Sequence, residues 1–293
     1  MTMAARATVE RAVRLPRPPQ FVLGGVPIHR ISMEYAAILV AEALLMRGEF
    51  PPLTIVGPNA QLVTLAQENK RFAAAMQAAD LSVPDGISVV LASRLLQSPI
   101  PERVTGGDLM ERMCAEAARY GFSVFFLGGL PGAAIMAARN LQERYPGLNI
   151  CGTCCPPMGF ENNPRELARI REKINAAEPD LLCVAFGAPK QEIWMQENRD
   201  QVRVGAILPV GAAFDTHAGL RRRAPRWIQW LGMEWGFRLA MEPRRLWRRY
   251  LIGNAKFVSL TLRQWLHETA AQTLRIARRA PVSEPGIPAE SGD

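Results

Sequence analysis

The sequence predicts an α/β protein: a Rossmann-like parallel sheet with helices on both faces, followed by a basic helical C-terminal appendage. Short apolar runs alternate with helix-like periods from about residue 52 to residue 214, and this alternation predicts the sheet. An excess of arginine after residue 218 marks the appendage. The chain of 293 residues is therefore divided into a disordered leader (1–22), an α/β core (23–218), an amphipathic appendage (219–279) and a disordered tail (280–293).

The elements of the core are expected in strict alternation. The apolar runs predict strands at 53–56, 81–84, 123–127, 149–153, 181–186 and 205–210. Helical spacing predicts helices at 60–79, 87–96, 133–145, 164–177 and 191–199. Parallel sheets place ligand sites at the carboxyl ends of their strands, so the loops that leave these runs are the candidate site.

Composition and charge narrow the function classes. The chain is 48% hydrophobic and 21% charged, which excludes wholesale disorder and collagen-like repeats. The net charge is +8, but residues 219–279 hold 14 basic and 3 acidic residues, so the rest of the chain is slightly acidic. A basic segment on such a body predicts an anionic partner: nucleic acid, an anionic membrane face or a phosphorylated substrate.

No targeting or membrane-spanning segment is expected. The first 20 residues are rich in arginine and lack the apolar region of a secretory signal. The longest uncharged stretch, 120–138, contains several glycines and a proline and is interpreted as a buried strand, turn and helix.

Five cysteines without an export signal indicate reduced thiols. Three of them, Cys151, Cys154 and Cys155, form a C-x-x-C-C cluster that could hold zinc or do redox chemistry. The favoured interpretation is a strand with small apolar side chains, because the histidines are scattered.

The appendage predicts two helical stretches, 224–241 and 243–266. In the second, an apolar stripe lies opposite a basic face of Arg245, Arg249, Lys256 and Arg263. The stripe consists of Trp247, Leu251, Val258, Leu262 and Trp265. Such a helix suits a membrane interface, and it equally suits packing against the core with a solvated charged side.

The loops that follow the predicted strands contain the candidate functional residues. The turn at Gly128 and Gly129 follows a strand and opens a helix, an arrangement that can cradle a diphosphate. It is not a full G-x-G-x-x-G motif and no acid ends the next strand, so a nicotinamide dehydrogenase is disfavoured and a plain tight turn remains an alternative. Asp85 at another exit can act as a general base or cap a helix, Asp108 favours capping, and Asp215 can accept hydrogen bonds from a base or ribose.

A metal clamp on a nucleotide diphosphate has no evident ligands, because no D-x-D pair occurs in the sequence. The charge of a departing diphosphate would then have to be met by arginines or helix N-termini, which the basic segment can supply.

Several spaced motifs together resemble the WecG/TagA/CpsF family of bacterial glycosyltransferases over residues 26–258. The motifs are Gly57-Pro58-Asn59-Ala60, Pro84-Asp85-Gly86, Pro101-Glu102-Arg103-Val104-Thr105-Gly106, Phe186-Gly187-Ala188-Pro189-Lys190-Gln191-Glu192, and Val210-Gly211-Ala212-Ala213-Phe214-Asp215. The last continues through Ala218-Gly219, Arg223-Ala224-Pro225, Glu234-Trp235, Arg238-Leu239, Glu242-Pro243 and Arg248-Arg249-Tyr250.

The resemblance implies an inverting, metal-independent transferase without a cofactor. Such enzymes move a sugar, often N-acetylmannosamine, from a UDP-sugar to a polyprenyl-diphosphate-linked saccharide in the synthesis of cell-surface polysaccharides. The implied location is peripheral, on the inner, cytoplasmic face of the cell membrane, with the appendage docking there. Nucleic acid is not an expected partner, and a homo-oligomer is left open.

The resemblance also assigns roles to residues. The catalytic group is Asp85 as the base, with Asn59 and Arg103 in the pocket. The substrate-binding group, which includes the glycine turn described above, is Gly128, Gly129, Gly187, Pro189, Lys190, Gln191, Asp215 and the appendage arginines Arg238, Arg245 and Arg248. Many relatives have Thr where this chain has Gly57, so the donor or the acceptor can differ from theirs.

Three alternatives remain at this point. A member of the same family could transfer another sugar, such as glucose or a hexuronic acid, for an exopolysaccharide. A membrane-peripheral module could bind a nucleotide without turnover. A nucleic-acid binder ranks last, because tryptophans in an apolar stripe are not separate stacking platforms.

Overall fold

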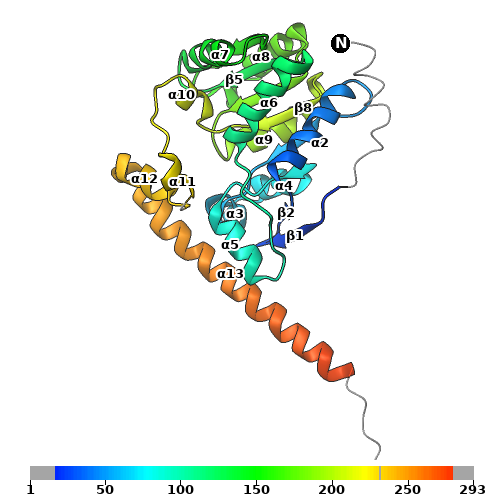
Figure 1. Ribbon diagram of the computed structural model, residues 1–293, viewed down its shortest axis with the longest axis vertical. Coiled ribbons are helices and arrows are strands. Elements are labelled where there is room, and N and C mark those ends of the chain that lie inside the picture. Colours follow the sequence, from blue (N-terminus) through cyan, green and yellow to red (C-terminus); the bar gives the residue numbers. More distant parts are fainter. Residues whose placement is uncertain (1–16, 231, 280–293) are drawn as a thin grey trace, which may run out of the picture.

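A six-stranded parallel sheet forms the centre of the molecule (Figure 1). The computed structural model describes residues 17–230 and 232–279, apart from the side chains of residues 226, 230, 238, 245, 248–250 and 272–279. The strands of the sheet lie in the order β4-β3-β8-β7-β5-β6. Their bounds are β3 Leu53–Val56, β4 Leu81–Ser82, β5 Ser123–Gly128, β6 Asn149–Cys154, β7 Leu181–Ala185 and β8 Ala206–Pro209.

Helices cover both faces of this sheet, as the sequence predicts. In β5, Val124 and Phe126 face one core, whereas Phe125 and Leu127 face another, because side chains alternate along a strand. The first core is completed by α2 (Met33–Leu45), α6 (Gly106–Tyr120) and α7 (Ala133–Arg144). The second is completed by α8 (Pro164–Ala177) and α9 (Lys190–Asn198).

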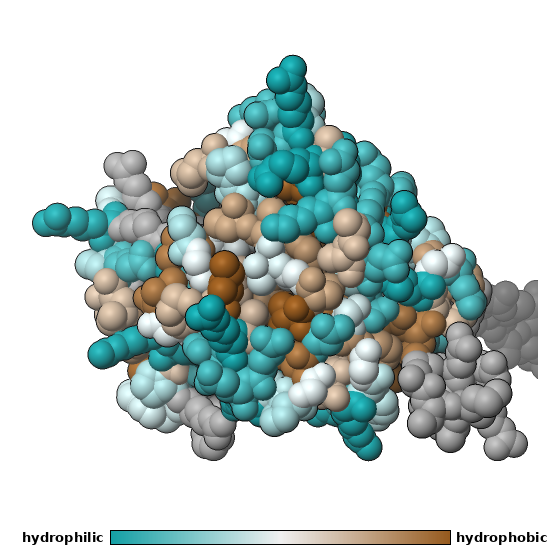
Figure 2. All heavy atoms as spheres, turned by 90° about the horizontal axis from the view of Figure 1, so that it is seen from above, coloured by the Kyte–Doolittle hydropathy of each residue, from teal (hydrophilic) through white to brown (hydrophobic). Residues whose placement is uncertain are grey.

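A third core lies at the β4 edge of the sheet. It contains a two-stranded antiparallel hairpin, β1 (Gln20–Leu23) and β2 (Val26–His29), packed with α3 (Ala60–Glu68), α4 (Lys70–Ala78) and α5 (Ile87–Leu95). Seen from above, the molecule has a mostly hydrophilic surface with separate apolar patches (Figure 2).

The predicted strands and helices of the core are all present, with small shifts at their ends, and one predicted helix is divided. The expected helix at 60–79 is two helices, because Asn69 ends α3 and its side chain accepts a hydrogen bond from the Phe72 amide at the start of α4. The hairpin, α2 and α6 were not predicted. Both helices carry an N-cap that marks their start, Ser32 for α2 and Thr105 for α6.

The predicted leader at 1–22 extends too far. β1 begins at Gln20 and Phe21 is buried, so ordered chain starts before residue 23. The apolar residues of the short hairpin are needed to close the third core. Residues 1–16 of the leader and the whole predicted tail at 280–293 lie outside the described residues.

The appendage forms three helices: α11 (Arg226–Trp230), α12 (Glu234–Met241) and α13 (Pro243–Arg279). The last is long and runs across one end of the core and beyond it (Figure 1). α13 packs on α3, and its Phe257 belongs to the third core. Leu246 and Thr261 of the same helix are also buried. The Gln264 amide bonds to the hairpin, accepting from the Gly24 amide at 3.1 Å and donating to the Val22 carbonyl at 2.7 Å.

Most of the predicted apolar stripe of α13 is therefore not the packed face. Leu251, Val258 and Leu262 are about half exposed, and only Trp265 packs against the third core. Within the described ranges, 17–230 and 232–279, no helix combines the length and the apolar composition needed to cross a bilayer.

The buried His29 and the half-buried His217 make the stability of the fold sensitive to acid. Burial lowers the pKa of His29 and of His217 below the ordinary value of 6.5. Below about pH 6.5 the unfolded chain takes up protons that the folded chain does not, so the free energy of unfolding falls until the folded pKa is passed. We expect urea unfolding to show this fall between pH 7.5 and 5.5.

The contribution of each histidine can be isolated. The variants His217→Gln and His29→Gln should each reduce the pH slope of the unfolding free energy, because glutamine takes up no proton. Slopes equal to that of the wild type in both variants would contradict the assignment.

Candidate functional site

The predicted site residues of the core lie along one edge of the sheet. Asp85 follows β4, Asn59 follows β3, Asp215 follows β8, Gln191 follows β7 and Gly129 follows β5. These five strands are neighbours and parallel, so their carboxyl ends share an edge. We call these five residues the row of predicted site residues. With neighbouring strands about 4.8 Å apart, the row is about 19 Å long.

The loops that carry Asp85 and Asn59 pack backbone to backbone. The Asp85 amide donates to the Pro58 carbonyl at 3.1 Å. A Cβ atom on Gly57 would lie 3.2 Å from the Asp85 Cβ, and one on Gly86 would lie 2.9 Å from the Asn59 Cβ. The two glycines thus allow the loops to touch, and they leave Asp85 half-buried at the rim.

Asn59 has a structural role in this arrangement. Its side-chain oxygen accepts hydrogen bonds from the amides of Gln61 and Leu62, at 3.1 and 3.2 Å, and caps α3. The cap fixes the loop against which Asp85 packs.

The segment 103–108 joins the β4 and β8 ends of the row. The Val104 amide donates to the Pro84 carbonyl at 2.9 Å, and Gly106 lies so close to the Pro209 carbonyl that a Cβ would be 2.3 Å from its oxygen. The Thr105 hydroxyl donates to the Asp108 carboxylate at 2.7 Å and accepts a hydrogen bond from the Asp108 amide. Asp108 thus helps to stabilise the start of α6, in line with the capping role that the sequence favoured. Arg103 is thereby held near Asp85, and its guanidinium forms an ion pair with Glu234 of α12.

The glycine turn after β5 lies beside Asp215. Gly128 has a positive φ of 99°, and a Cβ there would be 2.7 Å from the Ala185 carbonyl oxygen, so only glycine fits. The buried Asp215 carboxylate accepts the Leu130 amide at 3.1 Å and pairs with Arg221 at 3.2 Å. The turn leads into α7, whose N-terminus has no side-chain cap.

Side chains of the loop after β7 and of the first turn of α9 form hydrogen bonds within this segment. Gln191 is buried, accepts the Gly187 amide at 3.1 Å and donates to Glu192 at 2.8 Å. Pro189 precedes α9, and the Lys190 ammonium forms an ion pair with Glu161.

Other predicted residues are not placed at the row. Arg238 lies in α12, and Arg245 and Arg248 lie in α13, but their side chains are outside the described part of the chain.

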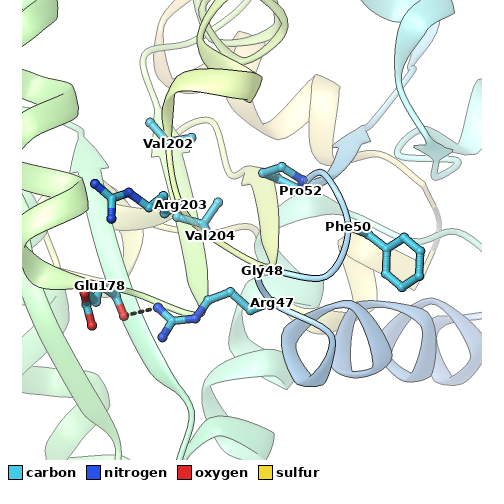
Figure 3. Close-up of a pocket in the computed structure, with 8 residues that line it drawn as sticks. All are labelled: Arg47, Gly48, Phe50, Pro52, Glu178, Val202, Arg203 and Val204. Carbon is cyan, nitrogen blue, oxygen red and sulfur yellow. Dashed lines mark hydrogen bonds between the residues drawn. The ribbon is translucent and has the colours of Figure 1, made fainter.

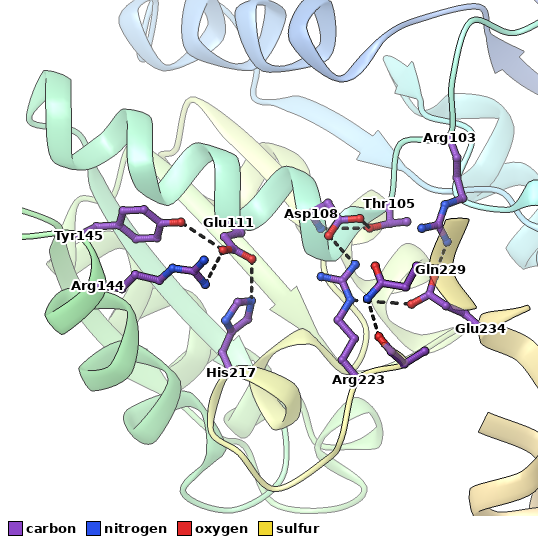
Figure 4. A network of polar contacts seen from close by, with 11 residues as sticks. Arg103, Thr105, Asp108, Glu111, Arg144, Tyr145, His217, Arg223, Gln229 and Glu234 are labelled. Carbon is purple, nitrogen blue, oxygen red and sulfur yellow. Dashed lines mark hydrogen bonds and ion pairs between the residues drawn. The ribbon is translucent and has the colours of Figure 1, made fainter. Parts of the chain in front are cut away.

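Three residues to which the sequence analysis gave no role lie at the rim: Arg221, Arg223 and Glu234. Arg223 and Glu234 are drawn in Figure 4 and belong to the motifs that carry the family resemblance. The only signal for Arg221 was its place in the basic segment. The turn at Gly232, between α11 and α12, rests on Ile87: a Cβ on this glycine would lie 2.7 Å from the isoleucine side chain. The appendage thus contacts the core two residues after Asp85.

The cysteine cluster is divided by the end of β6. Cys151 and Cys154 belong to the strand, and all five cysteines are free. The exposed Cys155 thiol donates to the Gly129 carbonyl at 3.5 Å, and desolvation raises its pKa. Within the described residues, no group of three His, Cys, Asp or Glu side chains is placed to hold a metal ion.

A separate cavity of about 330 Å³ lies at the opposite, amino edge of the sheet (Figure 3). It is lined by residues that precede β3, β7 and β8, among them Pro52, Glu178 and Val204. It is therefore remote from the row of predicted site residues.

The contact between the two loops can be tested by adding one methyl group. Gly86→Ala should lower the free energy of unfolding by about 1–3 kcal/mol, because the new Cβ would lie too close to the Cβ of Asn59, the residue that caps α3. Gly107→Ala is the matched control, since its Cβ would lie 3.5 Å from Ala213 in ordinary contact. Urea unfolding measures both, and an unaffected Gly86→Ala variant would show that the loops are not in contact.

Comparison with known proteins identifies the family of the chain. The sequence model described as "Glycosyl transferase WecG/TagA/CpsF family" matches residues 21–271. The chain is 32% identical over 217 residues to an N-acetylglucosaminyldiphosphoundecaprenol N-acetyl-beta-D-mannosaminyltransferase from Bacillus spizizenii (strain ATCC 23059 / NRRL B-14472 / W23), covering 74% of this chain and 80% of the relative. The resemblance found in the motifs is thus confirmed: the chain is a glycosyltransferase that belongs to the WecG/TagA/CpsF family.

Proposed function

We propose that this protein transfers an N-acetylmannosaminyl group from a UDP-linked donor to a polyprenyl-diphosphate-linked N-acetylglucosamine, with inversion and without a metal ion. The observation that carries the proposal is the sequence identity of 32% to the Bacillus enzyme over 74% of the chain. The fold adds support, because it brings the family motifs to one edge of the sheet. The donor nucleotide, the stereochemistry and the independence from metal are parts of the proposal.

Asp85 is the general base in this mechanism. Its carboxylate takes the proton of the acceptor hydroxyl while the hydroxyl oxygen attacks the anomeric carbon, and the bond from that carbon to the UDP phosphate oxygen breaks. The backbone bond from Asp85 to Pro58 and the tight contact with Gly57 support a rigid position for the carboxylate. A fixed base at the rim can reach a bulky lipid-linked acceptor.

The charge of the departing diphosphate is met by arginines and by backbone amides. Arg103 lies beside the Asp85 loop, and the uncapped N-terminus of α7 follows the Gly128–Gly132 turn. The appendage arginines Arg238, Arg245 and Arg248 complete this group. Positive groups aimed at developing charge perform the task that a metal performs elsewhere.

The nucleotide lies near Asp215 and Gln191. The Asp215 carboxylate is an acceptor that suits ribose hydroxyls or a base N–H. Its buried position between the glycine turn and Arg221 supports this role.

The appendage docks the enzyme on the membrane that holds the acceptor. The exposed stripe of α13 borders a shallow groove lined by Val258, Leu262 and Leu266, with Arg263 at its side. Apolar side chains flanked by cations suit an anionic lipid surface.

Another donor sugar is the second candidate. The three atoms nearest to a Cβ on Gly57 all belong to Asp85, so the missing side chain alters the surroundings of the proposed base. UDP-glucose and UDP-hexuronic acids therefore belong in the same assay.

Replacement of the proposed base should abolish most turnover. We expect Asp85→Asn to lower kcat by about 10²- to 10⁴-fold while donor binding changes little, because the amide keeps its shape but takes no proton. UDP release with UDP-ManNAc and a synthetic polyprenyl-diphosphate-GlcNAc acceptor, in the presence of EDTA, measures this. Full turnover by the variant would exclude Asp85 as the base, and turnover only after addition of Mg²⁺ would contradict independence from metal.

Membrane docking should depend on the exposed stripe. The double variant Leu262→Glu/Leu266→Glu should bind anionic vesicles at least about tenfold more weakly, because charge replaces apolar contact. The control is His267→Glu, which adds a negative charge at an exposed position across the helix. Co-sedimentation with vesicles measures both, and equal binding by all proteins would rule out docking through this stripe.

A further inference from the structure

Glu234 belongs to a family motif but has no part in the proposed mechanism. It is the first residue of α12, and its carboxylate forms an ion pair with Arg103. Both side chains are largely buried, with exposed fractions of 16% and 19%. The carboxylate of the appendage therefore contacts the arginine of the core that lies beside the Asp85 loop.

A second arginine extends this pair into a chain of alternating charges (Figure 4). Arg223 lies 3.8 Å from Glu234 through its Nε atom and 2.5 Å from Asp108 through its Nη2 atom. Asp108 is in turn held by the Thr105 hydroxyl. The chain Asp108–Arg223–Glu234–Arg103 thus begins and ends on the segment 103–108 and passes through the appendage.

The position of Glu234 does not depend on Arg103 alone. The turn at Gly232, two residues earlier, is seated on Ile87 with no room for a Cβ. Arg223 holds the carboxylate from a different side. Glu234 is therefore a fixed anion against which the long side chain of Arg103 is oriented, and a guanidinium held by a carboxylate keeps one geometry.

We propose that Glu234 is a positioning residue of the transferase, which holds the Arg103 guanidinium beside the Asp85 loop and so makes the appendage a part of the active site. The inference rests on the proposed function in one respect, the role of Arg103 toward the substrate. Glu234 acts only through Arg103 and touches neither substrate.

A double-mutant cycle separates positioning from general support. Glu234→Gln keeps the shape of the side chain but removes its charge, and it should lower kcat/KM about tenfold to hundredfold, as a displaced positioning group does. Arg103→Ala should lower kcat/KM by at least as much. In the Arg103→Ala background, Glu234→Gln should have no further effect, because residues that act as one unit are not additive.

The matched control is another ion pair between core and appendage. Glu68 of α3 pairs with Lys256 of α13, and both side chains are exposed. Neither residue belongs to the charged chain that contains Arg103 and Glu234. Glu68→Gln should leave kcat/KM unchanged. Thermal melting of each variant confirms that it is folded. Additive losses in the double variant, or wild-type activity of Glu234→Gln, would overturn the proposal.

Failure of the proposed function is detected separately. If the wild type does not turn over any donor tested, the substrate assignment fails, and the same cycle is then followed by hydrogen exchange of the amides in α12 and in 103–108. Glu234→Gln and Arg103→Ala should each speed exchange in both segments, and the double variant should not exceed the larger single effect. Unchanged exchange in Glu234→Gln would reject the coupling.

Discussion

The whole site depends on the pairing of β3 with β8. Two register pairs, Leu53 with Ala206 and Thr54 with Ile207, join β3 and β4 to the rest of the sheet. The Leu53 amide adds a bond to the Gly205 carbonyl, and α2 packs so closely on Gly205 that no side chain fits there. Without this joint, the loops of Asp85 and Asn59 would separate from those of Asp215 and the glycine turn.

The arginines of the described rim are already paired with carboxylates. Arg103 pairs with Glu234, Arg221 with Asp215 and Arg223 with Asp108. The side chains of these pairs are partly or largely buried, so salt screens them less than it screens fully exposed pairs. A diphosphate that enters the site must share these arginines with their carboxylates or draw on further cations of the appendage. The ion pairs hold the appendage against the core and orient its cations at the same time.

Gly57 lies next to Asp85, the proposed base. A methyl group at this position would contact Asp85 before any other residue, at distances of 3.2–3.6 Å. A side chain at position 57 would therefore crowd Asp85 first, and the glycine leaves Asp85 the room that it occupies.

The long helix α13 shows how the packing of a helix resolves an ambiguous pattern. Its apolar stripe fitted a membrane interface and packing on the core equally well. The helix packs on the third core through Phe257 and Trp265, whereas Leu251, Val258 and Leu262 are exposed. Membrane docking itself stays a prediction.

By itself the sequence determined the α/β class, the family, and the six strands and most of the helices between 53 and 210, because apolar periodicity and glycine turns are local signals. It also placed Asp85, Asn59, Asp215 and Gln191 at strand exits, which share an edge in any parallel sheet. It did not reveal the hairpin, α2 or α6, since their burial depends on contacts with distant segments. Only the tertiary structure decided that Arg103 meets Glu234, that the Leu130 amide meets Asp215 and that Gly232 rests on Ile87. These partners are separated by many residues in the chain, and no local pattern encodes which charges or surfaces the fold brings together.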